Sequence, residues 1–167
     1  MKKFFIAAVL CLAAIGAQAQ DYNWAIGVRG GGNSSGVTIK HILSDYNAVE
    51  VTFDYWYPKQ VSEGKRMIRT EAIHALYEWN TPIFTNGFIL YYGAGGHIGS
   101  MSMQKTSEKN GTENYGRLGL GLDGVVGIEY KLYDLPLAFS LDYRPYFNVF
   151  GFIPFFSNVS LGVKLAF

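Results

Sequence analysis

Three residues close together in the sequence carry the side chains of a hydrolase: His41, Ser44 and Asp45. An imidazole that accepts the proton of a serine hydroxyl activates this hydroxyl as a nucleophile, and a carboxylate can orient the imidazole. The same stretch also has the composition of an ordinary tight turn, because Ser, Asp and Asn side chains stabilise turns through local hydrogen bonds. Residues 41–45 are therefore a candidate site for nucleophilic catalysis, with a turn as the alternative interpretation.

The chain has two further histidines, His74 and His97. None of the three histidines is paired with another histidine or with a cysteine at the spacing of a metal site. His74 and His97 fall on inward faces of neighbouring predicted strands, where they could meet. We interpret them as a hydrogen-bonded internal pair, and the sequence predicts no metal site.

A glycine-rich segment, residues 119–124, matches the pattern G-x-G-x-x-G. A dinucleotide site needs this pattern between a strand and a helix, so that a phosphate meets the helix N-terminus. Here the alternation of apolar residues continues through the segment and no helical pattern follows. We expect the glycines to relieve crowding in a narrow interior, and the sequence predicts no cofactor.

Charged residues recur on the less apolar face of the predicted strands. An isolated buried ion costs several kcal/mol, so charges enclosed in a narrow interior must pair with one another. We expect these residues to form a paired polar core. They are the basic residues Arg29, Lys40, Lys131, Arg144 and Lys164 and the acidic residues Glu50, Asp54, Glu78, Asp123, Glu129 and Asp142.

The element that must close this interior is the final stretch, residues 159–167. Its odd-numbered residues are apolar, and its even-numbered residues are Ser, Gly, Lys and Ala. Strict alternation of this kind predicts a strand with one apolar and one polar face. No polar tail follows Phe167, so the strand would leave an unprotected edge unless it pairs with the first strand of a closed barrel.

The first 19 residues have the features of a secretory signal peptide. Lys2 and Lys3 precede an apolar run at 4–15, and residues 17–19 form an A-x-A cleavage pattern. The run is too short for a membrane-spanning helix, which needs about 20 apolar residues. We therefore expect a signal peptide at 1–19 and a single mature domain at 20–167.

The composition of the predicted mature chain excludes several classes of protein. Removing Lys2 and Lys3 leaves 12 basic and 13 acidic residues, so no basic excess exists that could attract nucleic acid. The one cysteine, Cys11, lies in the signal peptide, which excludes disulfides and thiol catalysis. No later segment holds 18 consecutive apolar residues, and such a chain is best accommodated in lipid as a closed barrel.

Alternation between turn signals predicts eight antiparallel strands. They cover roughly residues 22–29, 37–43, 49–57, 72–79, 88–97, 118–132, 139–148 and 159–167. An even number of strands is the rule for bacterial single-chain barrels. The fold class predicted is all-β: an eight-stranded up-and-down transmembrane barrel with a polar interior filled by side chains.

The connections and the aromatic residues predict how such a barrel is oriented. Connections after the odd-numbered strands are mostly longer than those after the even-numbered ones, which matches external loops and periplasmic turns, with both termini periplasmic. Aromatic residues gather at the strand ends, as in the girdles at lipid–water interfaces. One predicted girdle holds Tyr22, Trp24, Tyr46, Tyr77, Trp79, Tyr130, Tyr133 and Phe167, and the other holds Tyr55, Tyr57, Tyr115, Phe147 and Phe150.

These patterns, the glycine-rich strand at residues 91–96 and the terminal strand at 159–167 resemble the small eight-stranded outer-membrane barrels of the OmpA/OmpX-like group. The resemblance covers residues 20–167. It implies a bacterial outer-membrane location, with a terminal Phe167 that is recognised by the barrel-assembly machinery. The group comprises structural anchors, adhesion proteins and surface-interaction proteins, so the fold alone does not specify a function.

The function predicted is that of a non-enzymatic outer-membrane barrel with a structural or surface-interaction role. Its partners would be outer-membrane lipid and an extracellular partner at the loops 58–66, 100–116 and 148–156. The alternative is a lipid-acting enzyme centred on His41 and Ser44, although the His-Tyr-Ser-Asn type of signature of the lipid A deacylase barrels is absent. A soluble lipocalin-like carrier needs an apolar interior, which the inward charges contradict.

Overall fold

The computed structural model describes residues 23–62, 65–84, 87–107, 111–132, 134–150 and 156–167. The predicted signal peptide, Tyr22, Tyr133 and the segment 151–155 lie outside these ranges. Within them, every regular element is a β-strand, and all strand pairs are antiparallel. No helix in the described part of the chain has the length and hydropathy needed to cross a membrane.

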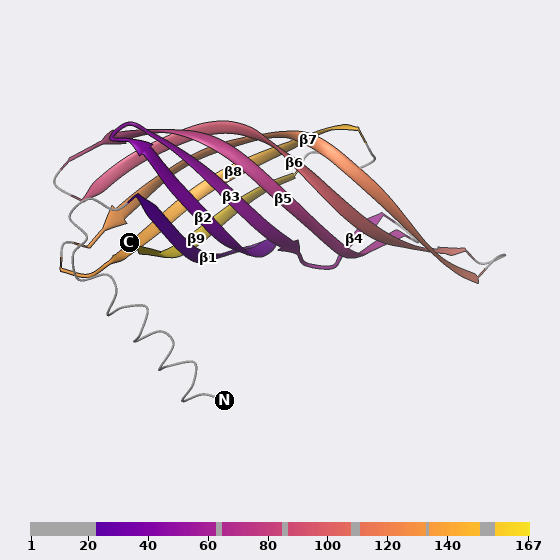
Figure 1. The fold of residues 1–167 in the computed structure, drawn as a ribbon. Helices are drawn as coiled ribbons and strands as arrows, with labels where there is room; N and C mark the ends of the chain where they lie inside the picture. Colours follow the sequence, from indigo (N-terminus) through magenta and orange to yellow (C-terminus); the bar gives the residue numbers. More distant parts are fainter. Residues whose placement is uncertain (1–22, 63–64, 85–86, 108–110, 133, 151–155) are drawn as a thin grey trace.

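The strands follow one another around a single sheet, with strong tilt and twist (Figure 1). Their bounds are β1 Trp24–Gly31, β2 Ser34–Ser44, β3 Asn47–Trp56, β4 Lys59–Ser62, β5 Lys65–Pro82, β6 Phe88–Ser107, β7 Gly111–Lys131, β8 Leu137–Phe150 and β9 Phe156–Ala166.

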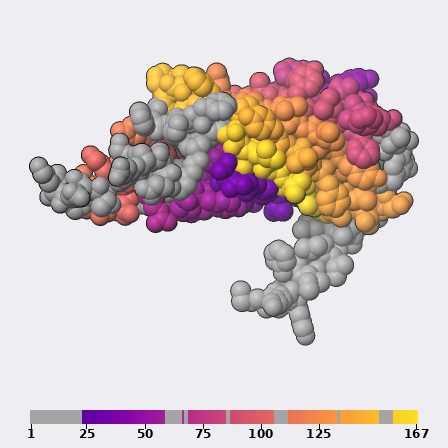
Figure 2. Space-filling view, turned by 180° about the vertical axis from the view of Figure 1, so that it is seen from behind, coloured from indigo at the N-terminus to yellow at the C-terminus, as the bar shows by residue number. Residues whose placement is uncertain are grey.

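Two pairings turn the sheet into a closed ring. β1 pairs with β9, and β3 pairs with β5. The short β4 also pairs with β5, at residues that come before those paired with β3. In Figure 2 the yellow β9 lies against the indigo β1. The backbone groups of Trp24 and Phe167 bond reciprocally at 2.8 and 3.1 Å, which extends this seam to the last residue. The ring has eight positions, which confirms the predicted barrel.

Side chains alternate between the outside and the inside of the ring, as the sequence predicts. Apolar residues from every strand of the ring face outward, for example Val28, Ile39, Val51, Ile73, Tyr92, Leu122, Leu141 and Leu161. Charged and polar residues face inward, together with Leu76, which is 1% exposed. On the predicted strand 72–79, Leu76 is the one large apolar residue of the inward face, and its predicted internal position is therefore confirmed.

Several predicted loops are wrong, because the strands continue through them. β6 runs to Ser107 and β7 begins at Gly111, so most of the predicted loop 100–116 is a β-hairpin. β4 and β5 form a second hairpin in the predicted loop 58–66, and β8 occupies the start of the predicted loop 148–156. Apolar residues alternate with polar ones only where one face of a strand is buried. Residues 112–114 and 116–118 are exposed on both faces, so no such alternation marks them as a strand. Backbone pairing persists there without any apolar pattern.

The connection between β1 and β2 is also shorter than predicted. Only residues 32 and 33 separate these strands, where the sequence suggested a break over 30–36. Glycines and serines lack the apolar alternation of a strand, yet their backbone groups pair in the ladder between β1 and β2. The predicted turns at the other end are present, and Gly87 has the positive φ of 97° that favours glycine in the turn before β6.

The aromatic residues confirm the predicted girdle at the end that carries the termini. Trp24, Tyr46, Tyr77, Trp79, Tyr130 and Phe167 are all exposed there, and Trp79 stacks on Tyr92 at 5.7 Å. At the other end Tyr55, Tyr57, Phe147 and Phe150 are exposed. The predicted place of Tyr115 in this girdle is wrong, because its ring packs against a buried cluster inside the barrel rather than facing outward.

The close approach of Gly127 to Tyr91 generates a testable prediction. A Cβ atom at position 127 would lie 2.6 Å from Tyr91 Cζ and 2.7 Å from the Leu141 carbonyl oxygen. Overpacking of this kind destabilises by about 1–3 kcal/mol, so Gly127→Ala should lower the denaturant midpoint of the folded barrel. Gly30→Ala is the matched control, because a Cβ at position 30 meets nothing within 4 Å. Equal midpoints for both variants would contradict the packing argument.

Candidate functional site

The interior of the barrel concentrates ionisable side chains that in most proteins lie at the surface. Among the described residues, four basic and six acidic side chains are buried inside the ring. The basic ones are Arg29, Lys40, Arg144 and Lys164, and the acidic ones are Glu50, Asp54, Glu78, Asp123, Glu129 and Asp142. Their inward orientation is confirmed, whereas Lys131, also predicted to face inward, is half-buried.

The layer nearest the termini is built around two lysines. Lys40 on β2 contacts Glu78 on β5 at 2.9 Å and Glu129 on β7 at 3.6 Å. Lys164 on β9 contacts the same Glu129 at 2.8 Å and Glu50 on β3 at 2.9 Å. Each lysine thus bridges two carboxylates, and the pairs connect five strands across the lumen. Alternating charges compensate the loss of hydration that burial imposes.

The next layer is built around two arginines. Arg144 on β8 contacts Asp142 at 3.0 Å and Glu50 at 2.5 Å. Arg29 on β1 contacts the same Asp142 at 2.9 Å and Asp54 at 3.6 Å. Glu50 belongs to both layers, because its second oxygen forms an ion pair with Lys164 of the lysine layer. The charged groups therefore form one continuous network rather than separate pairs.

Tyr91 on β6 packs beside both layers and is fully buried. Lys40 Nζ lies 4.8 Å and Lys164 Nζ 5.5 Å from the centre of its ring, within the range of a cation–π contact. Its hydroxyl donates to Asp142 at 3.1 Å. This one side chain fills the centre of the lumen and joins the lysine layer to the arginine layer.

A third layer contains the two inward histidines. His74 on β5 and His97 on β6 are direct partners in the strand register, with ring centres 5.3 Å apart. The Nδ1 atoms of both bond to the carboxylate of Asp123 on β7, at 2.8 Å for His74 and 2.5 Å for His97. The predicted neighbouring pair is confirmed, and the structure adds Asp123, which the sequence analysis placed in the charged core without connecting it to the histidines.

An apolar cluster lies above the histidines, toward the hairpin end. It consists of Trp56, Met101, Met103 and Tyr146, with Tyr115 packed against them. Tyr146 contacts the ring of His74 at 4.9 Å and that of His97 at 6.2 Å. Met101 and Met103 continue the inward positions of β6 beyond His97, and Tyr146 continues those of β8. Extending the alternation through the predicted loop 100–116 would have found Met101 and Met103.

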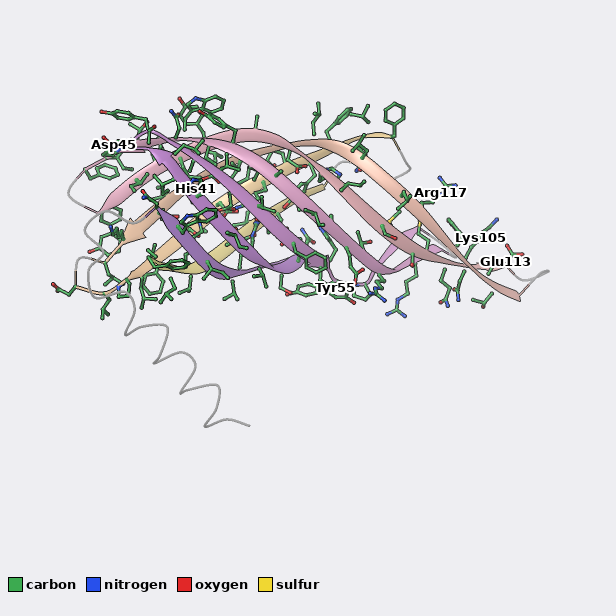
Figure 3. All side chains as sticks on the ribbon, viewed as in Figure 1. His41, Asp45, Tyr55, Lys105, Glu113 and Arg117 are labelled. Atoms are coloured by element: carbon green, nitrogen blue, oxygen red, sulfur yellow. The ribbon has the colours of Figure 1, made fainter. Side chains whose placement is uncertain are left out.

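The structure does not assemble His41, Ser44 and Asp45 into a catalytic group. His41 stacks on Trp24 at 4.1 Å, and its Nδ1 atom bonds to the Asn23 carbonyl oxygen at 2.9 Å. The Ser44 hydroxyl accepts from the backbone N–H of the turn at 3.4 Å and from the Asn47 side chain at 3.2 Å. No hydrogen bond joins His41 to Ser44 in the described part of the chain. His41 lies within β2, whereas Ser44 and Asp45 lie at the tight turn before β3, where Figure 3 shows Asp45 near the rim.

The glycine-rich segment 119–124 lies entirely within β7 and precedes no helix, so it lacks the context of a dinucleotide site. Gly121 makes room inside the barrel, as predicted for the glycines of this segment. A Cβ at Gly121 would lie 2.5 Å from the Cε1 atom of His97. The glycine therefore permits the histidine ring to lie flat against the wall of the lumen.

An apolar outer surface around a closed ring, with charges inside, defines a membrane-spanning β-barrel. Small barrels of eight strands have an interior just wide enough for side chains to fill. The four layers described above occupy this interior along its length, and Arg144, Tyr91, Lys40 and Lys164 are among its largest fully buried side chains.

Comparison with solved structures identifies the fold as that of the small eight-stranded outer-membrane barrels of the OmpA/OmpX-like group. This chain is similar to the N-terminal barrel of Pseudomonas aeruginosa OprF, with a TM-score of 0.61 and 11% identity. The match covers 86% of this chain and 95% of that one. Neisserial surface protein A matches with a TM-score of 0.60 and 12% identity over 86% of this chain and 93% of that one. Ail of Yersinia pestis matches with a TM-score of 0.52 and 11% identity over the same shares. No family model and no curated protein sequence matches the chain.

The charge network generates a prediction about stability. Arg144→Ala removes a partner from two buried carboxylates, and breaking a buried pair typically costs about 3–5 kcal/mol. We expect a loss of this size in the free energy of unfolding, measured by denaturant titration in detergent. Arg69→Ala is the control, because Arg69 pairs with Glu71 at the surface, with its side chain 63% exposed, and should change stability by less than about 1 kcal/mol.

The filled lumen generates a second prediction. Paired charges and buried aromatic rings fill the interior in the described part of the chain, so the folded wild type should show no steady conductance in planar lipid bilayers. Large, stable and reproducible channels would overturn the closed-core interpretation and favour a porin-like function. A larger barrel of known conductance, reconstituted in the same way, is the positive control.

Proposed function

We propose that this protein is a non-enzymatic outer-membrane barrel that contacts an extracellular partner through its projecting hairpins. Both termini would face the periplasm. Short turns join β2 to β3, β5 to β6 and β7 to β8 at the end where the chain termini lie, and the long hairpin of β6 and β7 extends from the opposite end (Figure 1). Short periplasmic turns and longer external segments are the usual arrangement of outer-membrane barrels.

The observation that carries the proposal is a strand edge that extends beyond the barrel wall. β6 and β7 remain paired as far as Ser107 and Gly111, whereas the pairing of β7 with β8 ends at Leu120 and Phe150. Residues 111–119 of β7 therefore pair only with β6 among the described residues. Beyond the wall, this sheet serves no purpose in spanning a membrane. An exposed strand edge with polar side chains is a surface for recognition.

The projecting segments are basic, although the predicted mature chain as a whole is slightly acidic. Residues 59–71 and 100–118 together hold seven basic and four acidic residues. Lys105 and Arg117 are exposed on the projecting hairpin, with Glu113 between them in the sequence (Figure 3). Such a distribution attracts a polyanion, and we propose a sulfated or phosphorylated polysaccharide as the class of partner.

The structure of Ail has also been solved in complex with the heparin analogue sucrose octasulfate. That complex supplies a probe for this chain, whose projecting segments carry the basic residues that favour a polyanion. We further propose that the barrel is inserted by the barrel-assembly machinery through β9 and Phe167, and that outer-membrane lipid covers its apolar wall.

Heparin affinity tests the proposed contact. The double variant Lys105→Glu with Arg117→Glu should bind heparin about tenfold or more weakly than the wild type, because both changes replace attraction by repulsion. The measurement is the dissociation constant of the folded barrel in detergent at fixed salt concentration. The control is Gln104→Ala with Asn114→Ala, which removes an uncharged contact of 3.3 Å in the same hairpin and leaves the charge unchanged.

Two outcomes would contradict the proposal. One is a wild type that binds neither heparin nor another polyanion at about physiological salt, and the other is undiminished binding by the charge-reversed variant. Heat-dependent electrophoretic migration, which reports folding of the barrel, must be the same for all variants. The barrel itself should fold without residues 105–113, because its ring closes below them and the buried cluster with Met103 and Tyr115 is kept.

A further inference from the structure

The histidine layer has the geometry of a metal site. His74, His97 and Asp123 come from three consecutive neighbours in the ring, β5, β6 and β7, and all three are buried. One potential ligand atom from each lies within 4.8 Å of the others. Three ligands held on adjacent strands of a rigid wall are a preorganised set, because the backbone ladder fixes their separation.

The two ring nitrogens of each histidine have different surroundings. Both Nδ1 atoms converge on Asp123, whereas both Nε2 atoms point away from it. His97 Nε2 meets Asn148 Oδ1 at 3.0 Å, and His74 Nε2 lies 3.7 Å from Asp54 Oδ2. Histidines that bind a metal through one nitrogen usually direct the other N–H to a carboxylate or amide oxygen. The outer partner of His97 is thus in place, and a carboxylate lies close to the outer nitrogen of His74.

Two buried groups at the same place lack a hydrogen bond. The Nε2 atom of His74 is buried and has no hydrogen-bond partner among the described residues, and neither oxygen of Asp54 accepts a hydrogen bond. Buried polar groups of this kind are rare, because each costs about 1–3 kcal/mol. A ligand that draws His74 and Asp54 together would satisfy both.

The charge of the lumen supports a bound cation. The buried network holds four basic and six acidic side chains, so with neutral histidines its net charge is −2. One divalent cation would bring it to zero. Protonation of both histidines would do the same, but would place two positive rings with their centres 5.3 Å apart in a buried site, where they repel. A single ion shared by two neutral rings avoids this repulsion.

We propose that His74 Nδ1, His97 Nδ1 and Asp123 bind one divalent transition-metal ion, with Zn²⁺ as the best match. Two imidazoles and a carboxylate suit Zn²⁺, which binds such atoms at about 2.0–2.2 Å, whereas Mg²⁺ and Ca²⁺ prefer oxygen ligands throughout. The ion takes the place between the Nδ1 atoms and the carboxylate, and small shifts of the three side chains admit it. Asp54 and Asn148 hold the outer nitrogens.

The place of this site in the fold indicates its role. It lies between the charged layers and the apolar cluster of Trp56, Met101, Met103 and Tyr146. The bound ion links β5, β6 and β7 just below the point where the hairpins leave the barrel wall. It therefore stabilises the base of the projecting sheet and completes the charge balance beneath it.

The test uses the folded barrel in detergent, purified without a polyhistidine tag. Zn²⁺ should bind with a stoichiometry of one ion per chain, measured by calorimetry and by metal analysis after dialysis, and should raise the thermal midpoint. X-ray absorption of the loaded wild type should show two imidazole ligands and an oxygen ligand. This measurement needs no variant, so it decides the proposal even if a substituted chain fails to fold.

Variants assign the ligands. His97→Gln and Asp123→Asn should abolish stoichiometric binding, and Asn148→Ala should weaken it by about 10–100-fold. His41→Gln is the matched control, because His41 lies on the outer rim and should leave binding unchanged. Folding of each variant is checked by heat-dependent electrophoretic migration.

Three results would overturn the proposal. The first is the absence of stoichiometric binding of Zn²⁺, Co²⁺, Ni²⁺ and Cu²⁺ by the folded wild type. The second is a metal coordination sphere without imidazole, or binding that is lost with His41→Gln. The third is a thermal midpoint that responds to pH through the histidine range and not to any of these metals, which would assign the missing charge to two protons.

Discussion

The structure depends on one constraint: the backbone hydrogen bonds of the ring must close on themselves. In hydrocarbon an unpaired N–H or C=O group costs several kcal/mol, so a sheet can span a bilayer only without edges. The pairing of β1 with β9, extended to Trp24 and Phe167, removes the last pair of edges. Closure with eight strands also sets a narrow lumen. Every inward side chain then has to share this space with residues from several other strands.

The charged network follows from that narrowness. Long basic side chains cross the lumen and meet carboxylates from distant parts of the sequence, as when Arg29 contacts Asp142 and Arg144 contacts Glu50. Glycines on the wall leave room for the largest rings, among them Tyr91. Because Glu50 is shared by the lysine and arginine layers, removal of one residue disturbs both. The result is a closed body whose lumen is filled by paired side chains.

Charge is divided along the axis of the barrel. The closed body holds a surplus of acidic groups inside, and the projecting segments 59–71 and 100–118 hold a surplus of basic groups outside. His74, His97 and Asp123 lie between them, close to the level where the pairing of β7 with β8 ends and the projecting hairpin begins. The proposed metal ion and the proposed polyanion thus act on opposite sides of the apolar cluster, and each can be tested without the other.

The sequence alone determined the barrel, its eight strands and its inward charges, because a lipid-facing wall imposes strict alternation on residues such as those of 159–167. Tertiary structure decided what that alternation cannot report. The hairpin at 100–116 has both faces exposed, so its pairing leaves no apolar pattern. The grouping of Asp123 with His74 and His97 depends on strand register and tilt, which bring together residues 49 and 26 positions apart. Local patterns encode burial, whereas contacts across the lumen arise only when the ring closes.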